Sequence, residues 1–78
     1  MTLIFVQLLC HPGKTYQVAD ELYQREIVSE LYSTSGDYDL IMKIYIPEDT
    51  DIGKFVNDRI LDVEGIQRSL TTLTFRAF

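Results

Sequence analysis

The sequence predicts an α+β fold with four strands and two helices in the order βαββαβ. Two observations support this fold class. Four segments rich in β-branched, aromatic and aliphatic residues have the composition of strands. Between them, two segments carry apolar residues at helical spacing, and Gly, Pro and Asp residues separate the elements. With 78 residues, the chain has room for one domain, which we expect to span residues 1–78.

The first half of the chain predicts a strand, a helix and two further strands. Leu3–Cys10 is expected to form the first strand, ended by a His-Pro-Gly sequence. Lys14–Gln24 is predicted to be a helix because its apolar residues fall on one helical face. Ile27–Thr34 and Leu40–Ile46 are the second and third predicted strands, and a Gly-containing turn joins them.

The second half predicts a helix followed by a last strand. Pro47 ends the third strand because it lacks the N–H group that a sheet ladder needs. Capping and acidic residues then precede an apolar helical stripe that begins at Ile52 and reaches Val63, with Gly65 as its stop. Ile66–Phe78 is the predicted last strand. This order is that of a ferredoxin-like unit, an antiparallel four-stranded sheet with two helices on one face.

The predicted first strand is apolar on both faces. Strand residues alternate between faces, so the two sets are Leu3, Phe5 and Leu9 on one side and Ile4, Val6 and Leu8 on the other. The third strand shows the same pattern. Because two helices cover only one face of a sheet, we expect the second face to pack against another copy, giving a homodimeric α/β barrel.

The composition excludes several classes of protein. The formal net charge is −5, and the seven Lys and Arg residues are dispersed among acids, so we expect no direct binding to nucleic acid. One cysteine and one histidine allow no intrachain disulfide and no closed zinc site, and we expect no metal or cofactor. No apolar run is long enough to span a membrane and no signal peptide is recognisable, which predicts no membrane association and a cytoplasmic protein.

Three stretches of the sequence resemble a known family. Tyr32–Leu40 follows the pattern aromatic-x-x-(Thr/Ser)-Gly-acid-aromatic-Asp-aliphatic. Gly65–Ser69 resembles a Gly-Val-x-Arg-(Thr/Ser) return strand, and Leu9–Gly13 resembles the end of the first strand and its Pro-Gly turn. Together these stretches resemble the effector-binding (RAM) domain of the Lrp/AsnC family over nearly the whole chain.

The resemblance has implications for assembly and function. It implies a dimeric α/β barrel, further assembly of dimers into a higher oligomer, and a free amino acid bound where two dimers meet. Full-length members of the family carry a helix-turn-helix domain, and this sequence resembles a stand-alone form without it. The resemblance thus implies a non-enzymatic amino-acid-sensing and oligomerisation domain, with a full-length Lrp/AsnC regulator as a further partner.

The turn between the second and third strands is the candidate effector loop. It contains Ser35, Gly36, Asp37 and Asp39. An acid can pair with the ammonium group of an amino acid, while glycine exposes backbone N–H groups that can bind the carboxylate. The alternative is an ordinary hairpin turn, in which glycine supplies a positive φ and aspartate bonds the local backbone.

The last strand supplies further candidate residues. Gln67, Ser69 and Thr71 recur at every second position and are expected to share one face, where they could bond an effector side chain. The alternative is a solvent-facing polar row. Arg68, on the opposite face, is expected to pair with a neighbouring acid.

An enzyme remains the main alternative, because dimeric barrels of this kind also host monooxygenases and isomerases. Such an enzyme would need a pocket inside the barrel with a desolvated acid or base, for which Glu30 and His11 are the candidates. His11 follows Cys10, but adjacent strand residues point to opposite faces and no group is present to orient the histidine. We therefore expect no catalytic residues. An ACT-like regulatory domain is a second alternative, although its effector loop normally follows the first strand.

Overall fold

A computed structural model describes all 78 residues and confirms the βαββαβ order. The strand Leu40–Ile46 matches the predicted bounds, and the other elements differ from them by between one and five residues at one or both ends. The elements in chain order are β1 (Thr2–Cys10), α1 (Thr15–Gln24), β2 (Glu30–Ser33), β3 (Leu40–Ile46), α2 (Ile52–Arg59) and β4 (Ile66–Leu73).

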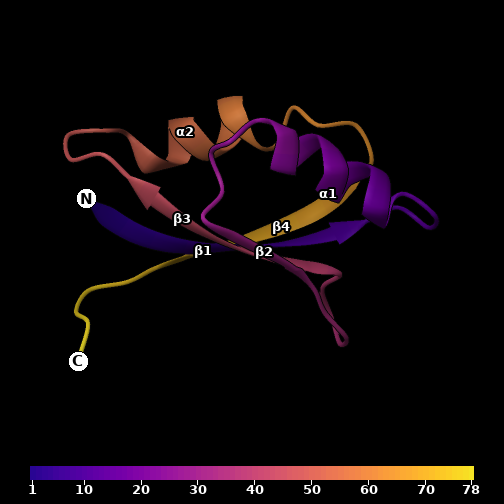
Figure 1. The fold of residues 1–78 in the computed structure, drawn as a ribbon, viewed down its shortest axis with the longest axis horizontal. Coiled ribbons are helices and arrows are strands. Elements are labelled where there is room, and N and C mark those ends of the chain that lie inside the picture. Colours follow the sequence, from indigo (N-terminus) through magenta and orange to yellow (C-terminus); the bar gives the residue numbers. More distant parts are fainter.

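The four strands form one antiparallel sheet in the order β2-β3-β1-β4. Val6 in the centre of β1 lies opposite Met42 of β3 and Thr71 of β4. Both helices lie on the same side of this sheet, so the molecule has two layers (Figure 1). The opposite side of the sheet, here called the open face, has no layer over it (Figure 1).

The hydrophobic core fills the space between the sheet and the helices. Alternate residues of β1 and β3 point into it, and each of them is almost fully buried. The core consists of Ile4, Val6, Leu8, Cys10, Val18, Leu22, Leu40, Met42, Ile44, Ile46, Val56, Ile60 and Val63. No polar side chain is buried among them, as expected for a small core held by apolar contacts.

Two predicted elements are longer than the observed ones. The second strand begins at Glu30 because Glu26, with φ +59°, turns the chain, and Ile27 and Val28 pack against the core instead of joining the sheet. Helix α2 ends at Arg59. Ile60 and Val63 are nevertheless buried, since the apolar stripe continues through the turns that follow the helix.

The prediction that the last strand runs to Phe78 is wrong, because β4 ends at Leu73. Its last ladder partner is Ile4. The Thr74 hydroxyl then donates a hydrogen bond of 2.6 Å to the carbonyl oxygen of Leu3, which occupies an acceptor that a continuing ladder would need. From Thr74 the chain leaves the sheet and descends on the side away from the helices (Figure 1).

Neither helix is both long enough and apolar enough to cross a lipid bilayer.

Gly65, just before β4, provides a test of how closely the chain packs against α1. Its φ is +107°, and a Cβ there would lie 2.9 Å from Cγ2 of Val18 and 3.2 Å from Cβ of Lys14. We expect Gly65→Ala to cost about 1–3 kcal/mol for backbone strain and about 1–3 kcal/mol more for overpacking. Urea unfolding of Gly13→Ala is the matched control, because Gly13 has φ +80° and open space around it. Equal losses in the two variants would contradict the predicted contact with α1.

Candidate functional site

The candidate effector loop is a closed hairpin turn at one end of the sheet. The N–H of Thr34 donates to the carbonyl oxygen of Asp39 at 2.8 Å, and the Thr34 hydroxyl donates to the carbonyl oxygen of Tyr38 at 2.9 Å. Ser35, Gly36 and Asp37 form the exposed tip, where Gly36 has φ +100°. The turn bends to the same side of the sheet as the C-terminal segment (Figure 1).

Asp39 fastens this loop to the central strand β1. Its Oδ2 atom accepts a hydrogen bond of 2.9 Å from the N–H of Cys10, and its own N–H donates to the carbonyl oxygen of Leu8 at 2.8 Å. This structural role explains the aspartate at this position. Asp37 has no such role, because its carboxylate is exposed and makes no hydrogen bond or ion pair with the rest of the chain.

Tyr38 connects the loop to β4. The guanidinium of Arg68 lies over the Tyr38 ring, 5.4 Å from its centroid, which is within the range of a cation–π interaction. The prediction that Arg68 pairs with an acid is therefore wrong. Sequence reasoning did not single out Tyr38, although its place between two aspartates in the motif was a usable signal.

Of the three polar residues of β4 that were predicted to share one face, only Ser69 and Thr71 do so. Ser69 and Thr71 lie opposite Leu8 and Val6, so they face the helices and line a groove beside Ile52 of α2. Gln67 falls at a β-bulge opposite the step from Leu9 to Cys10, and this bulge breaks the every-second-residue alternation. The structure thus places Ser69 and Thr71 on the helix side, away from the side to which the loop turns.

Cys10 and His11 do not form a nucleophile–base pair. Cys10 is buried, and burial raises the pKa of its thiol, with the nearby Asp39 carboxylate adding to the increase. A thiol of this kind is a poor source of thiolate. His11 is exposed, and its backbone N–H donates to the carbonyl oxygen of Gly65 at 2.8 Å.

Glu30 belongs to a polar cluster on the open face, together with Tyr32 and Lys43. The Tyr32 hydroxyl donates to Oε1 of Glu30 at 2.7 Å, and Nζ of Lys43 lies 3.2 Å from Oε2. These hydrogen bonds hold the pKa of Glu30 below its usual range and raise the pKa of Lys43. A general acid needs a raised pKa, so this arrangement does not favour the enzyme hypothesis.

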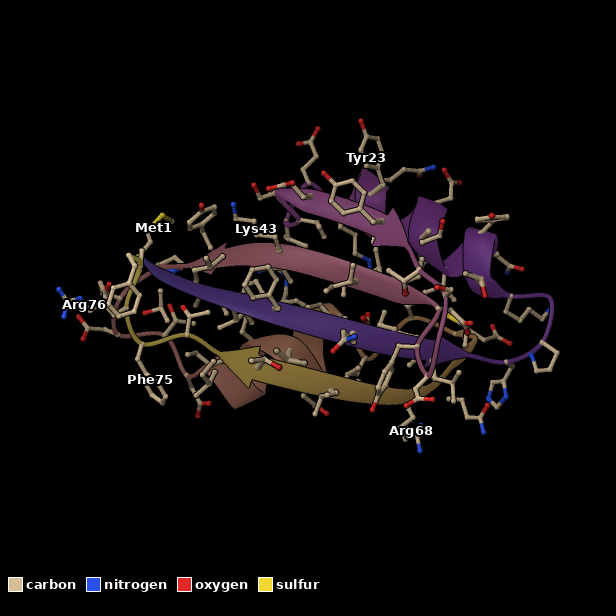
Figure 2. All side chains as sticks on the ribbon, turned by 90° about the horizontal axis from the view of Figure 1, so that it is seen from below. Met1, Tyr23, Lys43, Arg68, Phe75 and Arg76 are labelled. Carbon is tan, nitrogen blue, oxygen red and sulfur yellow. The ribbon has the colours of Figure 1, made fainter.

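Apart from this cluster, the open face is mainly apolar. Neighbouring strands present Leu3, Phe5, Leu9, Ile41, Tyr45 and Leu70 on it. None of these side chains is buried, whereas the alternate residues of β1 and β3 that face the helices are. Figure 2 looks onto this surface, with Lys43 on β3, Arg68 on β4 and Phe75 beyond the end of β4.

The βαββαβ fold, the loop that Asp39 anchors and the sequence at the start of β4 all agree with one family of regulatory domains. The family model described as "Lrp/AsnC ligand binding domain" matches residues 3–78. The chain belongs to this family.

Three comparisons illustrate the relationship. The transcriptional regulator FL11 of Pyrococcus furiosus is 28% identical over 74 residues, which are 95% of this chain and 48% of FL11. The chain therefore spans about half the length of this curated relative. The structure of TTHA0845 from Thermus thermophilus superposes with a TM-score of 0.90 at 28% identity, covering 100% of this chain and 98% of that one. The NMB0573/L-Met complex of Neisseria meningitidis, 14% identical with a TM-score of 0.82, shares the fold over 96% of this chain and 50% of its own.

The anchoring role of Asp39 can be measured. We expect Asp39→Ala to lower the free energy of unfolding by about 1–3 kcal/mol, because the N–H of Cys10 loses a charged acceptor. Asp39→Asn, which keeps an acceptor oxygen, should lose less. Asp37→Ala serves as the control and should stay within about 0.5 kcal/mol of the parent protein in urea unfolding, since its side chain is exposed. A similar loss in both alanine variants would refute the assignment.

Proposed function

We propose that this chain is an amino-acid-sensing and oligomerisation domain of the Lrp/AsnC type, and not an enzyme. The observation that supports this most directly is the apolar open face, on a sheet whose other face the helices already cover. The relatives named as transcriptional regulators support a regulatory role. They also favour the cytoplasm as the place where the domain acts.

The open face is proposed to pair with the same face of a second copy. Large apolar side chains from β1, β3 and β4 are half exposed on it, and a surface of this kind on a small protein usually marks an interaction site. A twofold axis makes such a contact self-complementary. Pairing would also extend the small core of a single chain, which contains only 13 buried residues.

The loop tip is the proposed site for the amino acid. Asp37 offers an unpaired carboxylate for the ammonium group, and the backbone around Gly36 is open because nothing lies within 4 Å of a Cβ built there. In the Neisseria complex the ligand is L-Met, which supports a free amino acid as the class of effector. Ser35, Asp39, Gln67, Ser69 and Thr71 remain predicted contributors. Because Ser69 and Thr71 lie on the helix side of the sheet, they can contribute only if the effector or a second dimer reaches that side.

A site shared between dimers would couple sensing to assembly. An effector that binds the assembled form more tightly than the free dimer must shift the oligomer equilibrium by linkage. The signal would then be a change in assembly, or association with a full-length regulator of the same family through the same surfaces.

The dimer proposal is tested by two matched leucines of β4. Leu70 is 46% exposed and lies opposite Gln7 on the open face, whereas Leu73 is 49% exposed and lies opposite Ile4 on the helix side. We expect Leu70→Asp to raise the dimer dissociation constant by about 100-fold or more, because a carboxylate would be buried in an apolar contact. Leu73→Asp should leave it nearly unchanged.

Sedimentation equilibrium measures both constants, and circular dichroism checks that each variant is folded. A parent protein that is monomeric at micromolar concentration would defeat the proposal, as would equal effects of the two substitutions.

The sensing proposal is tested by a thermal-shift screen of the twenty amino acids with oligomer size measured in parallel. At saturation, an effector should raise Tm by at least about 4 °C, the shift that about 1 kcal/mol produces in a domain of this size. Asp37→Asn should weaken its binding about tenfold or more, because the charge partner of the ammonium is lost. Asp49→Asn, at another exposed turn, is the control. If no amino acid changes Tm or size, the domain has a structural role only.

A further inference from the structure

The C-terminal segment Thr74–Phe78 carries two aromatic side chains with no contact to the core. Phe75 and Phe78 are both fully exposed in the single chain, at 100% and 108%. The guanidinium of Arg76 lies 4.9 Å from the centroid of the Phe78 ring, so the one aromatic contact of this segment stays within the segment itself. Two fully hydrated phenylalanines within four residues are unfavourable unless another surface covers them.

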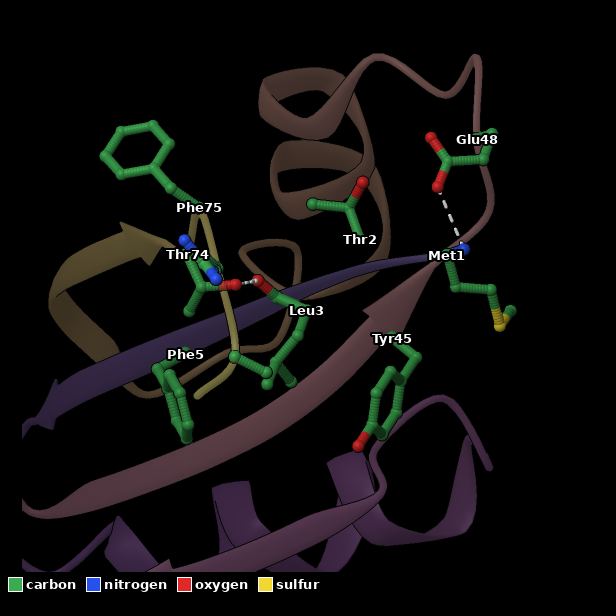
Figure 3. Close-up of a pocket in the computed structure, with 10 residues that line it drawn as sticks. Met1, Thr2, Leu3, Phe5, Tyr45, Glu48, Thr74 and Phe75 are labelled. Atoms are coloured by element: carbon green, nitrogen blue, oxygen red, sulfur yellow. Dashed lines mark hydrogen bonds and ion pairs between the residues drawn. The ribbon is translucent and has the colours of Figure 1, made fainter.

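An open hollow of about 670 Å³ lies on the open face where β1 begins. Leu3 and Phe5 of β1 and Tyr45 of β3 form its apolar walls on the sheet, and Glu48 stands at its rim (Figure 3). Residues 74–77 of the C-terminal segment line its remaining side. The hollow is continuous with the surface proposed to pair with a second copy, because Leu3, Phe5 and Tyr45 belong to that surface.

The chain's own C-terminal segment borders this hollow without filling it. The hydrogen bond from Thr74 to the carbonyl oxygen of Leu3 fixes the start of the segment at the edge of β1. Figure 3 shows the Phe75 ring directed away from Phe5 and Tyr45. Beyond this point the segment leads away from the sheet on the open side (Figure 1).

We propose that Phe75 and Phe78 of each chain dock into the hollow of a second copy, an inference that rests on the proposed pairing of open faces. The segment projects on the side where the second sheet would lie, and its apolar rings match the walls formed by Leu3, Phe5 and Tyr45. The charges are complementary as well, because Arg76 lies between the two phenylalanines and Glu48 at the rim is acidic. Glu48 already pairs with the Met1 amino group at 2.9 Å, and a carboxylate can accept further donors.

This exchange restricts the geometry of the dimer. The segment and the hollow are both at the end of the sheet where β4 finishes and β1 starts. Under twofold symmetry, a segment reaches the partner's hollow only if these two ends face each other. Both loops around Gly36, at the opposite end of each sheet, then lie at the other end of the dimer, where they are free to meet other dimers.

Disulfide trapping tests the exchange. Tyr45→Cys and Phe78→Cys are made as single substitutions with different tags, and the two proteins are mixed and oxidised. We expect a covalent heterodimer joined between positions 45 and 78. The double variant should likewise form covalently linked dimers, whereas a segment that folds back onto its own hollow would give an internally cross-linked monomer. The parent protein is the control, because its one cysteine, Cys10, is buried.

Substitution of the two rings provides a second measurement. Phe75→Ser combined with Phe78→Ser should raise the dimer dissociation constant at least tenfold, and Ala77→Ser in the same segment should not. All of these side chains are exposed in the single chain, so the variants should fold normally.

The outcomes separate the two proposals. The exchange is overturned if the double serine variant keeps the parent's dissociation constant and no 45–78 heterodimer forms. If Leu70→Asp still dissociates the dimer in that case, the pairing of open faces stands. A monomeric parent protein would overturn both.

Discussion

The structure depends on a sheet that is apolar on both faces while its own helices cover only one. β1 and β3 contribute alternate residues to the buried core, and the residues between them, including Phe5, Ile41 and Tyr45, remain accessible to water. Both helices, α1 and α2, lie on one side of the sheet. The hydrophobic effect therefore favours contact with a second surface, and the proposed assembly, sensing and segment exchange all follow from this imbalance.

The loop at one end of the sheet is mechanically connected to this surface. Asp39 bonds to the end of β1, the same strand that presents Leu3, Phe5 and Leu9 on the open face. Tyr38 contacts Arg68 of β4. A ligand that reorders the loop thus acts on the two strands that occupy the centre and one edge of the sheet, and this offers a physical route from effector to assembly. Coupling of this kind requires different affinities of the effector for the two assembly states.

The polar cluster of Glu30, Tyr32 and Lys43 fits this arrangement. It satisfies its own charges within one chain, so a second sheet can cover it without leaving an unpaired ion. A charged cluster at one side of an apolar face also restricts which registers two copies can adopt, because a shifted register would place apolar groups over the ions. The same contacts hold Glu30 ionised, which fits recognition better than proton transfer.

The sequence by itself determined the order of elements, the two apolar faces of β1 and β3, and the family, because periodicity and turn chemistry are local properties of the chain. Which of the two faces the helices cover was decided by the tertiary structure. The sequence also placed Asp39 in the candidate effector loop. Only the tertiary structure decided its partner, since Cys10 lies 29 positions away. The tertiary structure also decided the contact of Arg68 with Tyr38, the bulge at Gln67 and the end of β4 at Leu73. These features depend on which strands become neighbours and in what register, and no short-range pattern records that information.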